Sequence, residues 1–210
     1  MKEKWKEYFD GKNAGVTFGV TLAVLILCLF LLSRFILFAE ARQGVVLDDP
    51  VFHWFKAIDL NILIFALIYG SLISGIVYLV RSNPRGLVIA LQTYSLMIIV
   101  RMAMMYVVPL DPPMGTIDLQ DPLVFIIGTG TKITKDLFFS GHTATLFMIF
   151  LVTEKKWLKK VFFVNTLLVA VFVVLQKVHY TADVMVAPFV SYGAFKVVSF
   201  LNGEKKEIHH

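Results

Sequence analysis

Cysteine is nearly absent from this sequence, and so are the residue patterns that usually bind metals. The single cysteine, Cys28, can form no disulfide within the chain and no cluster of thiolate ligands. A His-Glu-x-x-His pattern, which places two zinc-binding histidines on one helical face, is also missing. We therefore predict a protein that uses no metal and no other cofactor.

Charged residues are scarce as well. They make up 17% of the chain, and hydrophobic residues make up 58%, whereas soluble domains have roughly 25% and 45–50%. Apolar stretches of about 18 or more residues, long enough to cross a bilayer, recur along the chain. The composition therefore predicts an integral, multi-pass membrane protein. Basic residues beside the apolar stretches explain the net charge of +5, so we expect no nucleic-acid partner.

The apolar stretches predict an all-α fold, a bundle of six transmembrane helices in a single domain covering residues 1–210. Residues 1–15 form a cytoplasmic N-terminal segment, and the apolar stretch after it lacks a signal-peptide cleavage site. Residues 203–210 form a tail whose final His209 and His210 resemble an affinity-tag remnant. Clusters of proline, glycine and lysine separate the helices. The six expected helices are Val16–Phe38, Leu60–Val80, Gly86–Val108, Leu137–Thr153, Trp157–Gln176 and Ala182–Leu201.

Positive charge is distributed unevenly between the two ends of this bundle. Most lysines and arginines fall on the side of the N-terminus, and five fall on the other side: Arg42, Lys56, Lys132, Lys135 and Lys177. The positive-inside rule then predicts that both termini are cytoplasmic. The longest loop, near residues 109–136, lies on the non-cytoplasmic side and is a candidate binding loop. The location that we expect is a bacterial inner membrane.

A first polar cluster lies where the fourth expected helix begins, at residues 134–143. Ser140 is a candidate N-cap, which directs the positive end of the helix outward, where an anion such as phosphate can bind. Gly141 lets a ligand approach the backbone, and His142 can donate a proton to a leaving oxygen. The alternative interpretation is an ordinary capped helix with a histidine at the membrane interface.

A second cluster, His179-Tyr180-Thr181-Ala182-Asp183, precedes the last expected helix. If that helix already begins at His179, a spacing of four places His179 and Asp183 on one face. The carboxylate then fixes the tautomer of the imidazole and leaves its other nitrogen as a nucleophile or base. The alternative is that Thr181 caps the helix and Asp183 only stabilises its positive end. Tyr180 is a candidate ligand of a headgroup.

Two arginines lie within the expected spans. Arg101 is about two turns below Pro109, where a guanidinium needs an anion, carbonyl groups or a water-filled cavity. It is therefore a candidate phosphate ligand, and snorkelling to the interface is the alternative. Arg34 is closer to the end of its helix and is interpreted as a snorkelling side chain. Lys132 and Lys135 are further candidate phosphate ligands.

The residues Phe-Ser-Gly-His-Thr at 139–143 and His-Tyr-Thr-Ala-Asp at 179–183 resemble the sphingomyelin synthase-like branch of the type 2 phosphatidic acid phosphatase (PAP2) superfamily. The resemblance implies a six-helix bundle whose site opens to the non-cytoplasmic side. It implies that His179 attacks phosphorus, Asp183 orients it, His142 protonates the departing alcohol and Asp136 assists His142. The chain lacks the Arg-Pro pair of ordinary lipid phosphatases. It also has Leu-Gln at 91–92, near the place where the branch has a tandem arginine.

The leading hypothesis is phosphoryl-group chemistry on membrane lipids. The donor is a phospholipid or a lipid phosphate, and the acceptor is ceramide, diacylglycerol or water. A rival enzyme class is an intramembrane serine protease that uses Ser140 and His179. A non-catalytic transporter or scaffold is the third interpretation, although such proteins place ionisable residues near mid-bilayer. The sequence leaves the oligomeric state open.

Overall fold

The computed structural model describes residues 1–119 and 133–203. Within these ranges the chain is all-α, with seven α-helices, one short 3-10 helix and no strand beyond a single bridge between Val45 and Leu110. Lys132 and the tag-like His209 and His210 lie outside the described residues. The elements in chain order are α1 (Lys2–Phe9), α2 (Ala14–Ala41), η1 (Pro50–Trp54), α3 (Asn61–Ser82), α4 (Pro84–Val107), α6 (Gly141–Val152), α7 (Lys156–Leu175) and α8 (Thr181–Leu201).

Five of these helices, α2, α3, α4, α7 and α8, are long and apolar enough to cross a membrane. Each matches an expected crossing to within a few residues. The expected fourth crossing differs, because α6 has only 12 residues, or about 18 Å at 1.5 Å per residue. It begins at Gly141 and not at Leu137, since Phe138 has a φ of 94° and Ser140 caps the helix. The long apolar helices support an integral membrane protein.

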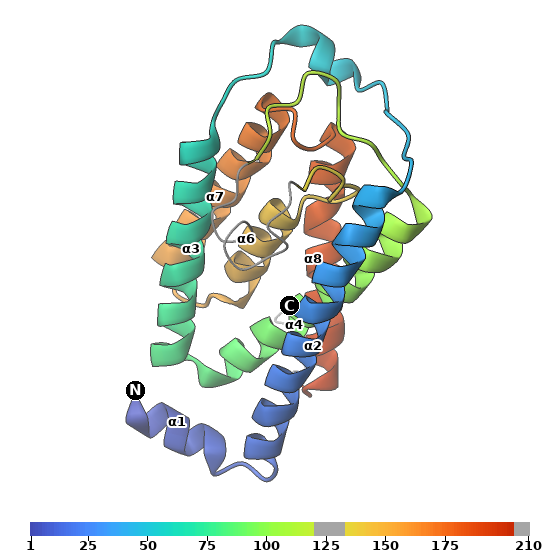
Figure 1. The fold of residues 1–210 in the computed structure, drawn as a ribbon. Helices are drawn as coiled ribbons and strands as arrows, with labels where there is room; N and C mark the ends of the chain where they lie inside the picture. Colours follow the sequence, from blue (N-terminus) through green and yellow to red (C-terminus); the bar gives the residue numbers. More distant parts are fainter. Residues whose placement is uncertain (120–132, 204–210) are drawn as a thin grey trace.

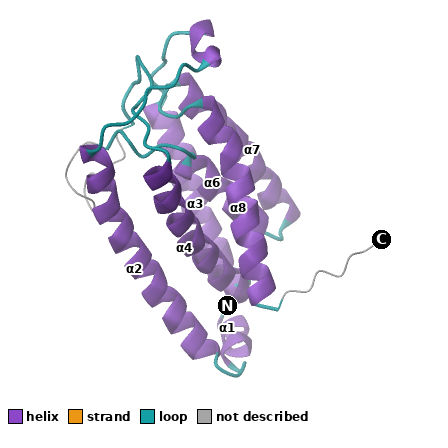
Figure 2. Ribbon diagram, turned by 90° about the vertical axis from the view of Figure 1, so that its right-hand side faces the viewer, coloured by secondary structure: helices purple, strands orange, loops and turns teal. Residues whose placement is uncertain are grey.

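The short helix α6 lies in the middle of the bundle, where it contacts α3, α4, α7 and α8. Figures 1 and 2 show these helices around it, while α2 runs along the outside of the bundle beside α4. The contact between α3 and α6 is close, because a Cβ on Gly75 would lie 2.8 Å from a methyl carbon of Ile149. The main apolar cluster joins α4, α6 and α8 through buried side chains such as Met97, Ala144 and Ala187.

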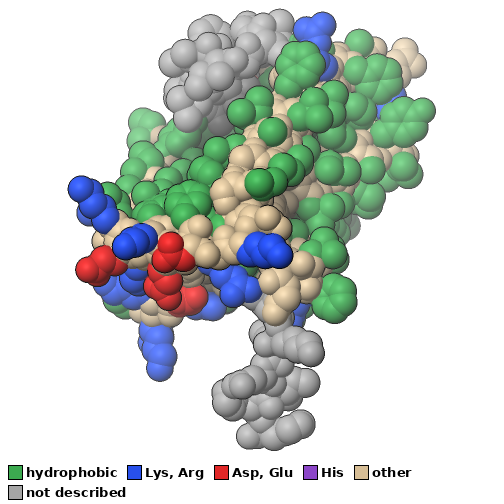
Figure 3. Space-filling view, turned by 90° about the horizontal axis from the view of Figure 1, so that it is seen from below, with side chains coloured by type: hydrophobic (Ala, Val, Ile, Leu, Met, Phe, Trp, Pro, Cys, Tyr) green, Lys and Arg blue, Asp and Glu red, His purple; other side chains and the backbone are tan. Residues whose placement is uncertain are grey.

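The two ends of the bundle are built differently. At the end that carries α1, the Trp5 indole donates to the carbonyl of Val80 at 2.8 Å, and Lys and Arg side chains gather on the face (Figure 3). At the opposite end, loops cover the helix ends (Figure 1). We call residues 42–60 and 108–119 the loop cap. Hydrogen bonds hold its two segments together, including Val45 N to Pro109 O at 3.0 Å.

Candidate active site

The start of α6 is the first part of the site. As the sequence predicted, Ser140 caps the helix, because its Oγ accepts from the backbone N–H of Thr143 at 3.3 Å and from the Thr143 hydroxyl at 3.1 Å. The Ser140 side chain is fully buried. The cap holds the positive end of α6 at the outer end of the bundle, and His142 is the second residue of the helix. An anion placed here is stabilised by the helix dipole.

The start of α8 is the second part. His179 Nδ1 lies 3.4 Å from Asp183 Oδ2, at the long end of the hydrogen-bond range, and both side chains are buried. The same carboxylate oxygen accepts from the backbone N–H of Tyr180 at 3.2 Å. The helix begins at Thr181, one residue before the predicted start at Ala182 and two residues after His179, so the condition that it already begins at His179 is not met. The pair forms because Asp183, in the first turn, reaches back over the start of the helix.

This geometry also excludes Thr181 as the N-cap, because Thr181 is the first helical residue and Tyr180 holds the cap position. A carboxylate on Nδ1 favours the tautomer in which Nδ1 carries the proton and Nε2 keeps its lone pair. Nε2 of His179 is thereby suited to act as a nucleophile or a base. The Asp183 carboxylate can therefore accept from a backbone N–H at the start of the helix and from the His179 imidazole at the same time.

The two helix starts meet. The backbone N–H of Ser140 donates to the carbonyl of Asp183 at 3.1 Å. The imidazole rings of His142 and His179 have their centroids 6.2 Å apart, at an angle of 62° between the ring planes. The structure therefore brings together the two histidines and the carboxylate that the sequence singled out. It also directs the positive ends of two helices toward one place.

Arg101 reaches this place from α4. Its guanidinium forms a two-point pair with Asp136, with Nε 2.7 Å from Oδ1 and Nη2 2.6 Å from Oδ2. A Cβ on Gly141 would lie 1.7 Å from Nη1, so the guanidinium occupies the space that a side chain would need there. The ring of Phe139 lies against it, 5.4 Å from the central carbon. Arg101 thus has an anion and a buried position, as its depth in the membrane requires.

Asp136 was expected to assist His142, and the structure shows its carboxylate on Arg101. The pairing is physically reasonable, because a guanidinium beside the positive end of α6 would otherwise raise the electrostatic energy of both. Asp136 is about a quarter exposed, unlike the more deeply buried Arg101. A direct role for Asp136 in proton transfer stays a prediction.

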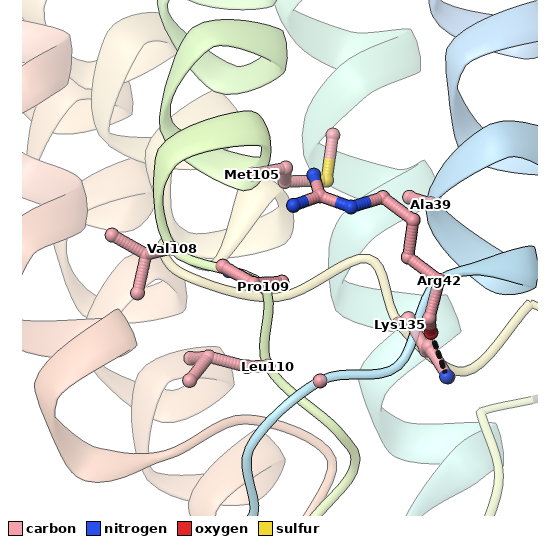
Figure 4. A pocket seen from close by; sticks show the side chains of 8 residues that line it. Ala39, Arg42, Met105, Val108, Pro109, Leu110 and Lys135 are labelled. Atoms are coloured by element: carbon pink, nitrogen blue, oxygen red, sulfur yellow. Dashed lines mark hydrogen bonds between the residues drawn. The ribbon is translucent and has the colours of Figure 1, made fainter.

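Tyr180 and Lys135 are held by the loop cap and its surroundings. The Tyr180 hydroxyl donates to Asp111 O at 2.8 Å and accepts from Leu47 N at 3.1 Å, and burial raises the pKa of this phenol above its ordinary value. The Lys135 ammonium lies 2.8 Å from Asp111 Oδ1 and donates to Arg42 O, the contact drawn in Figure 4. Contact of either side chain with a headgroup stays a prediction.

Sequence reasoning missed Asp49. Its Oδ2 accepts from the backbone N–H of Thr181 at 2.7 Å, so a residue of the loop cap satisfies the start of α8. Its Oδ1 accepts from Val51 N at 3.1 Å and thereby also caps η1. The Asp49-Pro50 pair predicts a local turn. Nothing in the local sequence indicates a partner 132 residues away.

A comparison with protein families finds one that covers this site. Residues 135–200 match the family described as PAP2 superfamily C-terminal. The matched segment contains Asp136, both helix starts and their histidines, whereas Arg101 lies before it. The comparison with curated proteins finds no match. The match supports lipid phosphoryl chemistry of the phosphatase type in general, and the segment that carries the two histidines and Asp183 is similar to the PAP2 superfamily C-terminal family, in line with the sequence resemblance to that superfamily.

Proposed function

We propose that this protein transfers a phosphoryl group, or a phospho-headgroup, from a membrane lipid through a covalent intermediate on His179. The observation that carries the proposal is the buried pair of His179 Nδ1 and Asp183 Oδ2 at 3.4 Å, with the ring of His142 6.2 Å away. The donor is a phospholipid or a lipid phosphate. The acceptor is water or a lipid alcohol such as ceramide or diacylglycerol.

Substrate binding places the phosphate at the positive end of α6, between the two histidines and beside Arg101. Helix ends and guanidinium groups suit this charge, because they direct N–H donors at its oxygens. Asp136 holds the Arg101 fork in two-point geometry before substrate arrives. An incoming phosphate either shares this guanidinium with Asp136 or displaces the carboxylate from it.

In the first step, Nε2 of His179 attacks phosphorus and a nitrogen–phosphorus bond forms. The bond between phosphorus and the oxygen of the departing alcohol breaks, and protonated His142 gives its proton to that oxygen. Asp183 stabilises the positive charge that develops on the His179 ring, as a carboxylate behind a nucleophilic or basic imidazole does. The departing group leaves as a neutral alcohol.

In the second step, neutral His142 takes a proton from water or from a lipid hydroxyl. The oxygen so activated attacks phosphorus, and the bond to Nε2 of His179 breaks with its electron pair returning to nitrogen. Water gives hydrolysis, and a lipid hydroxyl gives a new phospholipid. The same groups serve both outcomes, so the access of water to the site decides between them.

We further propose a six-crossing topology with both termini in the cytoplasm and the site open to the non-cytoplasmic side, in a bacterial inner membrane. The short α6 would be the sixth crossing, because neighbouring helices rather than lipid surround it. The basic face around α1 fits the cytoplasmic side (Figure 3). Labelling of single cysteines in a Cys28→Ala background, one at position 8 and one at position 54, tests the sidedness.

The experiment that tests the reaction uses purified protein and headgroup-labelled phospholipids, with and without ceramide or diacylglycerol. Free phosphate, free phospho-headgroup and a new phospholipid identify three different reactions. His179→Ala and His142→Ala are expected to be inactive, and Ser140→Ala to be weakened. No turnover of any lipid by folded protein would contradict the proposal, and translocation of unchanged lipid would support the transporter alternative.

The rival serine protease needs Ser140 as its nucleophile. The observation against it is that Ser140 Oγ is buried and accepts from both the N–H and the hydroxyl of Thr143. A nucleophilic hydroxyl instead needs a base within hydrogen-bond distance. Loss of all activity in Ser140→Ala, with His142→Ala unaffected, would nevertheless favour the protease.

A further inference from the structure

A groove on the outer surface of the bundle carries a charge that the proposed reaction does not use. It lies between α2 and α4 and is lined by Leu31, Arg34, Phe35, Met102, Ala103 and Tyr106. Figure 2 shows the two helices side by side at one edge of the bundle. The groove is shallow and open to the surroundings of the bundle, with a volume of about 530 Å³.

Arg34 is the feature of this groove that requires an explanation. It is the only charged residue from Ala14 to Ala39. Within residues 1–119 and 133–203 no acidic side chain, carbonyl or aromatic ring pairs with its guanidinium. Arg101 shows the contrast, since it has Asp136 as its anion. A guanidinium on a membrane-spanning helix needs an anion, carbonyl groups, a water-filled cavity or access to the interface, and in this groove the described residues provide no anion.

The neighbouring charges leave the groove open to an external anion. Glu40, the acid of α2, accepts from Thr134 and from the backbone of Lys135. Arg42, two turns above Arg34, stacks over the Tyr106 ring at 5.2 Å and donates to the Tyr106 carbonyl at 3.0 Å. These contacts close the outer end of the groove. Below them the lining is apolar apart from Arg34 and the Tyr106 hydroxyl.

The depth of Arg34 indicates the source of the anion. It lies 20 residues after Ala14, or about 30 Å at 1.5 Å per residue, which is close to the thickness of the hydrocarbon core. With the start of α2 at one boundary of that core, Arg34 reaches the other boundary, where lipid phosphates lie. The apolar lining at Leu31, Phe35 and Met102 then runs alongside lipid chains. Phosphate and chain are both present in a glycerophospholipid.

We propose that the groove between α2 and α4 is a binding site for one glycerophospholipid, whose phosphate pairs with Arg34 and whose acyl chain lies along Leu31, Phe35 and Met102. The site is separate from the one at His142 and His179, and it does not depend on the proposed reaction. α2 packs mainly against α4. A lipid seated between α2 and α4 therefore adds to the contact that holds α2 on the bundle.

The test combines photolabelling with binding measurements on the purified full-length protein in detergent. Phosphatidylglycerol with a diazirine on its acyl chain should label peptides that contain residues 31–35 and 102–106. Excess unlabelled phosphatidylglycerol should suppress this labelling. Diacylglycerol with the same chains, which lacks the phosphate, and glycerol 3-phosphate, which lacks the chains, should compete at least tenfold more weakly.

Three variants separate the groove from general effects of charge. Arg34→Gln should weaken phosphatidylglycerol binding about tenfold or more, as expected for the loss of a hydrogen bond between charged groups, and Arg34→Lys should retain part of the affinity. Ala103→Trp, at an exposed residue of the groove, should block labelling by filling the space. Arg81→Gln is the matched control, because Arg81 is an exposed arginine at the end of α3.

The results that would overturn the proposal are equally definite. Labelling spread evenly along the exposed side of α2 would show ordinary surrounding lipid. Equal affinity in Arg34→Gln and Arg81→Gln would show that Arg34 holds no phosphate. Competition by diacylglycerol as strong as that by phosphatidylglycerol would show that the phosphate is not recognised.

Discussion

The starts of α6 and α8 contribute the two histidines, but they are held in different ways. Ser140 caps α6 through Thr143, three residues away. The start of α8 depends on the loop cap, because Asp49 accepts from Thr181 N and the Tyr180 hydroxyl contacts Leu47 and Asp111. The comparison indicates that His142, the proposed acid, stands on a locally determined helix start. His179, the proposed nucleophile, stands on one that is assembled by distant segments.

The largest expected difference between the two helix starts is chemical. His179→Ala removes the proposed nucleophile, and we expect kcat to fall by about 10⁴-fold or more with any leaving group. His142→Ala removes the proposed general acid, and a group in that role contributes about 10²–10⁴-fold. That loss should shrink with p-nitrophenyl phosphate, whose leaving group needs no proton. The loss of kcat in each variant is measured from steady-state rates with a lipid phosphate and with p-nitrophenyl phosphate. An equal loss for both substrates in His142→Ala would contradict its role as an acid.

A smaller change tests the proposed phosphate site beside α6. In Gly141→Ala the new Cβ would lie 1.7 Å from Nη1 of Arg101, so the guanidinium must move. Because a displaced charge-assisted contact costs about 1.5–3 kcal/mol, we expect kcat/KM to fall roughly 10- to 100-fold. Gly193→Ala is the control, since nothing lies within 4 Å of a Cβ at that position of α8. Equal kinetics of the two variants would show that Arg101 does not bind substrate.

The difference between a helix start held by local contacts and one held by distant segments also explains how much of the structure the sequence could predict. The five long helices and the cap at Ser140 follow from apolar runs and from one local hydrogen bond, and the sequence predicted them. The fourth helix was expected to begin at Leu137, but the positive φ of Phe138 interrupts the backbone there. Phenylalanine has no preference for such a conformation, so nothing in the sequence indicated it. Asp49 was missed because its partner is 132 residues away. Arg101 was identified from its depth in the membrane, but its pairing with Asp136 depends on how α4 packs against residues 136–141.

A third prediction compares the two caps directly. Ser140→Ala should cost about 0.5–2 kcal/mol of stability, which is usual for the loss of an N-cap. Asp49→Ala should cost at least as much and should also lower kcat, because the turn that carries His179 loses its tie to the loop cap. Asp49→Asn keeps an acceptor oxygen and should recover most of kcat. Thermal unfolding and the separate values of kcat and KM distinguish these outcomes. A change in stability alone in Asp49→Ala would give Asp49 no positioning role.

The smallest effect concerns Tyr180, the other tie between α8 and the loop cap. Tyr180→Phe removes a hydroxyl bonded to Asp111 O and Leu47 N, which should cost about 0.5–1.5 kcal/mol, because both backbone groups are only partly shielded and can bond to water instead. Burial raises the pKa of the phenol in the folded protein. The neutral phenol therefore contributes stability that is fully present below the ordinary pKa of about 10 and is lost as the pH rises through the folded value.

Thermal unfolding between pH 8 and pH 11 should accordingly show an alkaline loss of stability in the natural protein that is reduced in Tyr180→Phe. Tyr192→Phe is the control, because Tyr192 is an exposed residue on α8 and the same chemical change there should leave the alkaline profile unaltered. Identical alkaline profiles for the natural protein and Tyr180→Phe would mean that the phenol is not what ties the start of α8 to the loop cap. The tie would then rest on Asp49 alone.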